Sequence, residues 1–145
     1  PELLVCDEIV SALDVSIQSQ IINLLIDIKE KKKLSFLFIA HDLIVVSYFC
    51  DRIAVMYGGT IVELASAKDI IESRLHPYTT LLYNSIPDIT KSHSFEKIVD
   101  VVNPTIEPTG CPFYNRCHIK KTLCKESMPQ LREINKNHFV ACFCI

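Results

Sequence analysis

The sequence has too few glycines to build a phosphate-binding loop of the P-loop type. Its 145 residues include three glycines, Gly58, Gly59 and Gly110, and no G-x-x-x-x-G-K-[ST] segment. That loop supplies the backbone amides that cradle nucleotide phosphates. This stretch of sequence is therefore not a complete P-loop ATPase.

Three further features are absent, and each absence bears on the class of protein to expect. No apolar run approaches the roughly 18 residues that a membrane-spanning helix needs. A formal net charge of −2 and a pI of about 6.2 provide no basic field, so nucleic acid is not an expected partner. No basic and apolar leader precedes the first strand, so nothing indicates secretion. The seven cysteines are accordingly expected to be thiols of a reducing cytosol rather than a disulfide framework.

The first forty residues show the pattern of a β-α-β unit. The apolar run Leu3–Cys6 predicts a buried strand. Apolar residues at helical spacing between Ile17 and Ile28 predict a helix that Asp14 caps and the basic run 29–33 ends. A second apolar run, Ser35–Ala40, predicts a parallel strand, which makes the unit a right-handed crossover.

Shorter elements are expected along the rest of the chain. They are a helix over Leu43–Cys50, a hairpin of Arg52–Tyr57 and Thr60–Ala65 around Gly58-Gly59, a helix over Ser66–Ser73, and a helix over Tyr78–Ser85 that Pro77 opens. Periodicity is lost after Pro87, which predicts two domains, 1–87 and 88–145. The two prolines of Pro104–Pro108 predict an extended segment within the second domain.

Ionisable side chains follow both strands of the predicted crossover. Asp7 and Glu8 come at the end of the first strand, and His41 follows the second. Because open α/β sheets bind ligands at the carboxyl ends of their strands, these side chains are expected at one edge. In P-loop NTPases an aspartate in this place holds Mg²⁺ beside the nucleotide phosphates. The pattern therefore indicates metal-phosphate chemistry.

The order of these motifs resembles the second half of an ABC-transporter ATPase. Leu3-Leu4-Val5-Cys6-Asp7-Glu8 resembles Walker B with its catalytic glutamate, Ser11-Ala12-Leu13-Asp14 the D-loop, and His41-Asp42 the switch histidine. Arg74-Leu75-His76-Pro77-Tyr78-Thr79 and Gly110-Cys111-Pro112-Phe113 narrow the resemblance to ATP-binding subunits of oligopeptide/dipeptide or nickel importers. It implies an α/β fold: the second half of a P-loop ABC-type nucleotide-binding domain with a small cysteine-containing C-terminal extension. It also implies that the chain is a C-terminal fragment.

The resemblance assigns a role to each motif residue. Asp7 would bind Mg²⁺, Glu8 would act on the attacking water, His41 would contact the γ-phosphate of ATP, and Asp14 would lie at the interface with a second ATPase subunit. The intact protein would energise peptide import from the cytoplasmic face of the cell membrane. It would work there with two permease subunits and an extracytoplasmic peptide-binding protein. The fragment alone is expected to be inactive, and a non-catalytic remnant or a metal-binding module is the alternative function.

One departure from the family pattern follows the acidic pair. The family reads Asp-Glu-Pro-Thr, whereas this chain reads Asp7-Glu8-Ile9-Val10. The change frees a backbone φ angle and removes a hydroxyl group. It is compatible with a divergent active enzyme, with the weaker member of an asymmetric ATPase pair, or with a decaying gene.

Four cysteines of the C-terminal part have the spacing C-x5-C-x6-C-x17-C. They are Cys111, Cys117, Cys124 and Cys142. Four thiolates can hold either one zinc ion or a [4Fe-4S] cluster. The first gap is longer than in common zinc knuckles, and some members of the resembled family carry an iron-sulfur cluster here, so the cluster is favoured. The alternative is a set of reduced packing thiols, and Cys144 could replace Cys142 in either site.

Overall fold

The structure is a computed structural model that describes residues 1–86 and 109–145. Their contacts divide the chain into two compact units, Pro1–Asp51 and Arg52–Ile145, which are described separately below. The predicted domain boundary after Pro87 and the predicted extended segment Pro104–Pro108 lie outside the described residues. No helix among the described residues has both the length and the apolar character needed to cross a membrane.

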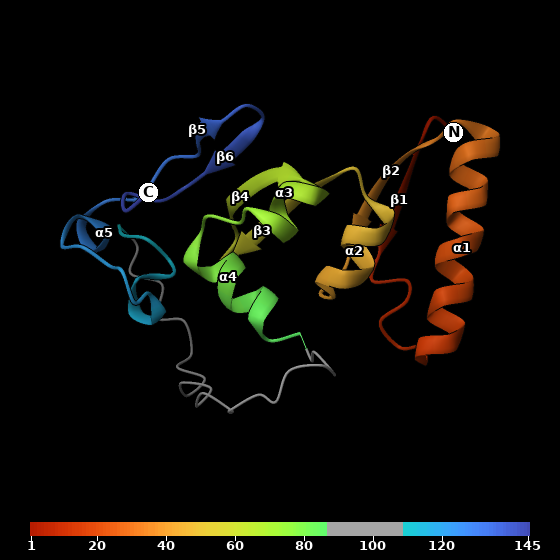
Figure 1. The fold of residues 1–145 in the computed structure, drawn as a ribbon, viewed down its shortest axis with the longest axis horizontal. Coiled ribbons are helices and arrows are strands. Elements are labelled where there is room, and N and C mark those ends of the chain that lie inside the picture. Colours follow the sequence, from red (N-terminus) through yellow and green to blue (C-terminus); the bar gives the residue numbers. More distant parts are fainter. Residues whose placement is uncertain (87–108) are drawn as a thin grey trace. The chain divides into compact units, whose positions relative to one another are not determined.

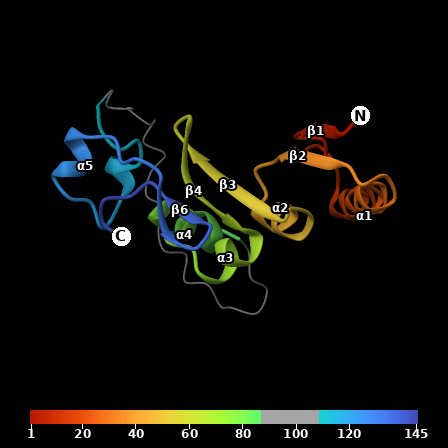
Figure 2. The same ribbon diagram turned by 90° about the horizontal axis from the view of Figure 1, so that it is seen from above.

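The first unit is the expected β-α-β crossover followed by a short helix. It consists of β1 (Leu3–Asp7), α1 (Val15–Lys32), β2 (Ser35–Ile39) and α2 (Leu43–Phe49). The two strands are parallel, from Leu3 opposite Ser35 to Asp7 opposite Ile39, so their carboxyl ends meet at one edge (Figures 1 and 2). The predicted parallel pairing is confirmed.

The core of this unit lies between the two helices and one face of the sheet. Val10, Ile22, Leu25 and Phe49 are its buried members. The Phe49 ring contacts two aromatic rings of β2, with centroid distances of 5.2 and 5.1 Å. The opposite face of the sheet remains exposed, with Leu3, Val5 and Leu37 all more than half accessible, because alternate residues of a strand point to opposite faces.

Aspartate side chains begin both helices of the first unit. Asp14 Oδ1 accepts the backbone N–H groups of Ser16 and Ile17 at 3.1 and 3.0 Å, which confirms the predicted cap of α1. Asp42 caps α2 in the same way, by accepting the N–H groups of Ile44 and Val45. These side chains satisfy N–H groups that have no partner inside the helix.

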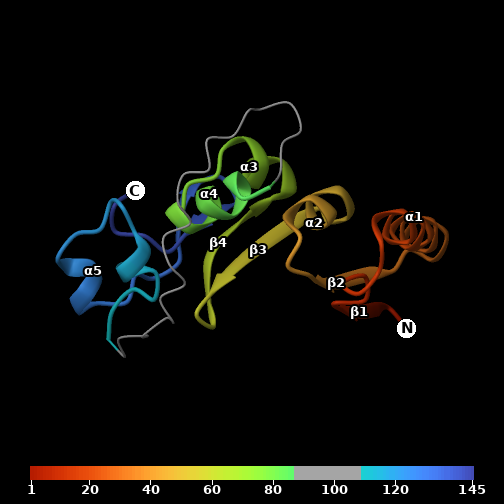
Figure 3. The same ribbon diagram turned by 90° about the horizontal axis from the view of Figure 1, so that it is seen from below.

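The second unit is built on a four-stranded antiparallel sheet. Its elements are β3 (Arg52–Tyr57), β4 (Thr60–Ser66), α3 (Ala67–Glu72), α4 (Pro77–Asn84), the 3₁₀ turn η1 (Tyr114–Arg116), α5 (Leu123–Glu126), β5 (Arg132–Asn135) and β6 (His138–Val140). The β3–β4 hairpin lies beside α3 and α4 (Figure 3). Gly58 and Gly59 have φ angles of 56° and 81°, as the tight turn of a two-residue hairpin requires.

The last two strands were not predicted from the sequence. The strand order is β3-β4-β6-β5, so β6 pairs with β4 across a long stretch of chain, with Glu63 opposite Val140. Both new strands are short, of four and three residues. Strands this short give almost no periodic signal, and their stability comes from pairing with a distant strand.

Candidate functional site

The acidic pair lies where β1 leaves the sheet. Asp7 is the last residue of β1, and Glu8 adopts a φ angle of 47°, which is uncommon for a residue other than glycine. Its N–H donates to the Ile39 carbonyl at 2.9 Å, while its own carbonyl accepts the N–H and the hydroxyl of Ser11. Hydrogen bonds on both sides therefore fix the backbone of this turn.

The histidine of the second strand reaches the same edge. His41 Nδ1 lies 3.8 Å from Glu8 Oε1, and both side chains are well exposed. The structure therefore brings together Glu8 and His41, as the motif order predicted, with Asp7 directly adjacent in the chain. No group of three or more potential ligands for a metal ion occurs among the described residues. The single carboxylate of Asp7 nevertheless fits Mg²⁺, because proteins commonly hold this ion through one or two carboxylates together with substrate phosphates.

Asp14 has a structural partner in this unit. Its carboxylate accepts the Ser16 hydroxyl at 2.6 Å. That hydrogen bond, together with the Ile17 and Ser16 amides, lowers the pKa of Asp14 below its usual value. Asp14 therefore remains ionised at neutral pH as a helix cap, and the predicted role at a subunit interface stays a prediction.

The structure gives a physical reason for the unusual Ile9-Val10 pair. Val10 is 2% exposed and packs in the core of the first unit, whereas Ile9 is 42% exposed. A valine here places apolar surface where threonine would place a hydroxyl that needs a partner. The turn that carries Glu8 is held by Ser11 without a proline.

The four predicted cysteine ligands share one local feature in the second unit. Each sulfur accepts a backbone N–H group, and the donors are Phe113 to Cys111, Ile119 to Cys117, Lys121 to Cys124 and Cys144 to Cys142. In three of the four cases the donor lies two residues after the cysteine. Such hydrogen bonds stabilise sulfur in its anionic form and tune sulfur ligands of metal clusters.

The same thiols lie in one partly buried neighbourhood. Burial raises the pKa values of Cys111 and Cys117, and the thiols of Cys124 and Cys142 add smaller contributions to both. A single zinc ion would need its four sulfurs about 3.8 Å apart, since Zn–S bonds are about 2.3 Å long and tetrahedral. The described residues contain no group of three or more side chains placed to hold a metal ion, so the thiols as they lie form no ready-made site. A four-iron cluster separates its thiolates more widely, because each sulfur binds a different iron.

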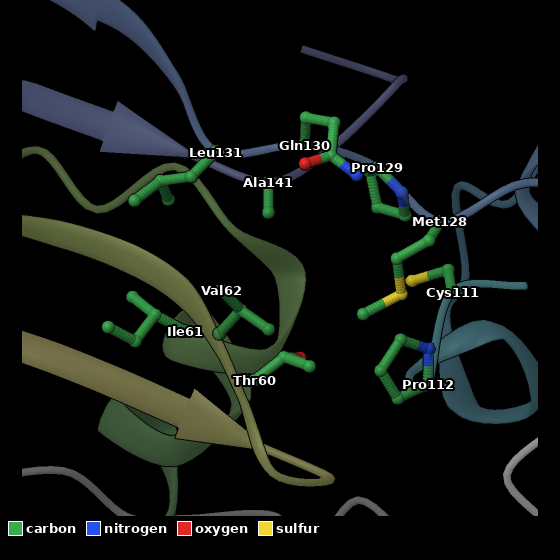
Figure 4. A pocket seen from close by; sticks show the side chains of 10 residues that line it. All are labelled: Thr60, Ile61, Val62, Cys111, Pro112, Met128, Pro129, Gln130, Leu131 and Ala141. Carbon is green, nitrogen blue, oxygen red and sulfur yellow. The ribbon is translucent and has the colours of Figure 1, made fainter.

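A cavity of about 360 Å³ adjoins one of these cysteines. Cys111 lies on its wall beside Met128, facing Val62 of β4 (Figure 4). The other walls are formed mainly by apolar side chains of β4 and of the segment around Pro129. Of the four cysteines, Cys111 therefore borders a mainly apolar cavity.

A buried carboxylate connects three parts of the second unit. Glu63 is fully buried on β4, and it accepts the N–H groups of Leu75 and His76 at 2.7 and 2.9 Å. Its Oε1 also lies 2.7 Å from Nε2 of the buried His138 on β6. Sequence reasoning missed this network, although an acidic residue inside the apolar run of β4 was the available signal. His138 is therefore engaged away from the cysteines.

The two motifs that narrow the family resemblance, 74–79 and 110–113, contact each other beside this network. His76 is 1% exposed, and its Nδ1 accepts the Tyr78 N–H at 3.1 Å as the cap of α4. Phe113 packs against His76, Tyr57 and Tyr78, with centroid distances of 5.8, 5.1 and 5.6 Å. The His-Pro-Tyr segment thus anchors the start of the cysteine-containing segment.

The buried histidine should give this unit an acid-sensitive stability. Burial lowers the pKa of His76 to about 4, against a usual value near 6.5, although Glu63 opposes the shift. Its contribution is complete above pH 6.5 and is lost as the pH falls toward 4, because the unfolded chain binds the proton more readily. We expect a loss of roughly 3 kcal/mol of unfolding free energy over this range. Urea unfolding at several pH values measures it.

An asparagine at position 76 offers the matching test. His76→Asn keeps a side-chain acceptor for the first turn of α4 but cannot titrate. We expect its unfolding free energy to change less between pH 6.5 and pH 4 than that of the wild type. The control His118→Asn removes an exposed histidine and should leave the pH dependence unchanged. An unaltered pH dependence in His76→Asn would show that other groups cause the acid sensitivity.

Comparison with known proteins supports the resemblance deduced from the motifs. Residues 62–124 match the family model described as "Oligopeptide/dipeptide transporter, C-terminal region". The chain is 46% identical over 147 aligned residues to the oligopeptide transport ATP-binding protein AppF of Bacillus subtilis, covering 98% of this chain and 45% of the relative. It is 44% identical over 146 residues to the "Probable peptide ABC transporter ATP-binding protein y4tR" of Sinorhizobium fredii, covering 99% of this chain and 44% of the relative. The chain thus spans less than half the length of these relatives.

Proposed function

We propose that this chain forms the C-terminal part of an ATP-binding subunit of a peptide importer, because nearly its whole length is homologous to such proteins. The complete subunit binds and hydrolyses ATP to energise peptide import. The observation that carries this proposal is the meeting of Glu8 and His41 at the edge where β1 and β2 end, directly beside Asp7.

Each residue of this edge has one task in the proposed mechanism. Asp7 would hold Mg²⁺, which would neutralise phosphate charge. Glu8 accepts a hydrogen bond from the attacking water and thereby orients it. His41 donates a hydrogen bond to the terminal phosphate, and its Nδ1 lies 3.8 Å from the Glu8 carboxylate. The phosphate cradle is supplied by sequence outside this chain.

The proposed assembly follows from the same homology. Asp14 lies at the interface with a second ATPase subunit, and two permease subunits form the membrane pathway. An extracytoplasmic peptide-binding protein delivers cargo to the permeases. The ATP-binding subunit is peripheral, at the cytoplasmic face of the membrane.

The lone 145-residue chain should neither bind ATP tightly nor hydrolyse it, because it has no phosphate-binding loop. Isothermal titration with Mg-ATP should show no binding in the micromolar range, whereas the complete subunit should bind. The matched control is the complete subunit with its phosphate-loop lysine replaced by alanine, which should behave like the lone chain. Micromolar binding by the lone chain would contradict this prediction.

We also propose that Cys111, Cys117, Cys124 and Cys142 hold a [4Fe-4S] cluster. Support comes from the spacing of the four cysteines and from the backbone N–H groups that the Cys124 and Cys142 sulfurs accept. Bound to metal, the four sulfurs would connect η1, α5 and the chain end, and metal binding contributes folding free energy to small modules.

Protein that is purified without oxygen should be brown, with broad absorbance in the visible blue and about four irons per chain. Cys117→Ser should remove this absorbance. The control Cys50→Ser, a cysteine of the first unit, should retain it. Colourless protein with stoichiometric zinc would favour the zinc alternative. Colourless, metal-free protein with an ordered C-terminus would rule out metal ligation at these cysteines.

A further inference from the structure

A fifth thiol, outside the four-cysteine pattern, lies close to one member of that pattern. Cys144 Sγ is 3.9 Å from Cys124 Sγ. Cys124 is 6% exposed within α5, whereas Cys144 is partly exposed in the tail after β6. The Cys144 thiol also donates to the Ile119 carbonyl at 3.0 Å. Solvent therefore reaches this pair of thiols through Cys144.

Backbone contacts hold both members of the pair in place. The Cys111 N–H donates to the Cys124 carbonyl at 2.8 Å. Gly110 packs so closely that an added Cβ would clash with the Lys125 carbonyl oxygen. On the other side, the Arg132 guanidinium donates to the carbonyls of Cys142 and Ile145, on either side of Cys144. The two sulfurs are therefore neighbours because of the fold.

The sulfurs of the pair are close enough to form a disulfide bond after a small movement. An S–S bond is about 2.05 Å long, so the two sulfurs need to approach by about 2 Å. Rotation of the partly exposed Cys144 side chain about its Cα–Cβ bond covers such a distance. The Cys144 sulfur lies 3.9 Å from the Cys124 sulfur, whereas the Cys142 sulfur accepts the Cys144 N–H, so Cys144 is the better-placed partner of Cys124.

We propose that Cys124 and Cys144 form a reversible disulfide when a peroxide or a low-molecular-weight disulfide is present. With hydrogen peroxide, the Cys144 thiol becomes a sulfenic acid and one water is released. The Cys124 sulfur then attacks the sulfenic sulfur, which forms the S–S bond and releases a second water. Two thiols are oxidised, one peroxide is reduced, and a dithiol reductant reverses the reaction.

The bond has a consequence that rests on the proposed cysteine cluster. Cys124 cannot serve as a thiolate ligand while it is bonded to Cys144. Oxidation of the pair therefore leaves three of the four ligands and blocks loading of the site until the disulfide is reduced. The pairing itself does not depend on the cluster, so the two claims are tested separately.

Peptide mapping of metal-free protein tests the pairing. The reduced 145-residue chain is treated with oxidised glutathione, free thiols are blocked with N-ethylmaleimide, and the protein is digested with trypsin. We expect peptide 122–125, which carries Cys124, to be linked to peptide 137–145. This product should exceed other Cys124 linkages by about tenfold or more, because the pair reacts as preorganised neighbours. The same treatment in urea gives the distribution without the fold.

Two matched variants identify the partner within peptide 137–145. Cys142→Ser leaves Cys144 as the only cysteine of that peptide and should retain the link, whereas Cys144→Ser should lose it and leave Cys124 blocked by N-ethylmaleimide. Cys124 linked to Cys111, Cys117 or Cys142 in the wild type, or the urea distribution under native conditions, would overturn the proposal. Iron content is measured on separate anaerobic samples, so a chain that forms the disulfide without ever binding iron contradicts only the cluster.

Discussion

Replacing Glu8 by glutamine in the complete subunit should lower the ATP turnover rate by about 10²–10⁴-fold and leave ATP affinity nearly unchanged. A positioned carboxylate that acts on the reacting water contributes a factor of this size. Glu8 is exposed at the carboxyl end of β1, where hydrogen bonds to Ile39 and Ser11 fix its backbone. Phosphate release measures turnover, and titration with a fluorescent ATP analogue measures affinity.

A control variant separates this effect from the loss of one negative charge. Glu2→Gln removes an exposed carboxylate just before the other end of β1 and should leave turnover unchanged. Asp7→Asn should weaken nucleotide binding only when Mg²⁺ is present. Near-normal hydrolysis by Glu8→Gln would show that the Ile9-Val10 turn has moved the catalytic role to another residue.

Replacing Glu63 by glutamine should destabilise the second unit by roughly 3–5 kcal/mol, because the exchange breaks a buried charged network. The carboxylate accepts Leu75 N–H, His76 N–H and His138 Nε2 with no water access. A glutamine amide presents an NH₂ group to at least one of these donors. Urea unfolding followed by tyrosine fluorescence measures the change, since the chain has no tryptophan.

The control for this substitution is another glutamate of the same sheet. Glu133 on β5 is exposed and accepts the Asn137 N–H at 2.7 Å. Glu133→Gln keeps an acceptor oxygen and should change the unfolding free energy by about 0.5 kcal/mol or less. If Glu63→Gln changed the unfolding free energy as little as Glu133→Gln is expected to, the Glu63 network would add nothing to stability.

The sequence by itself determined the fold of the first unit and the placement of its ionisable residues. Apolar runs, the Asp14 cap and the order of Asp7, Glu8 and His41 are local signals, and a parallel crossover necessarily brings its two strand ends to one edge. The expected β1–β2 pairing and the approach of His41 to Glu8 are accordingly present.

Tertiary structure alone decided the organisation of the second unit. The pairing of β4 with β6 and the contact of Glu63 with His138 each join residues at least 75 positions apart. The approach of Cys144 to Cys124 joins residues 20 positions apart. Such contacts arise from side-chain packing and pairing between distant segments, which no local periodicity encodes. The spacing of the cysteines identified a group of thiols, but only the fold selected which two of them are neighbours.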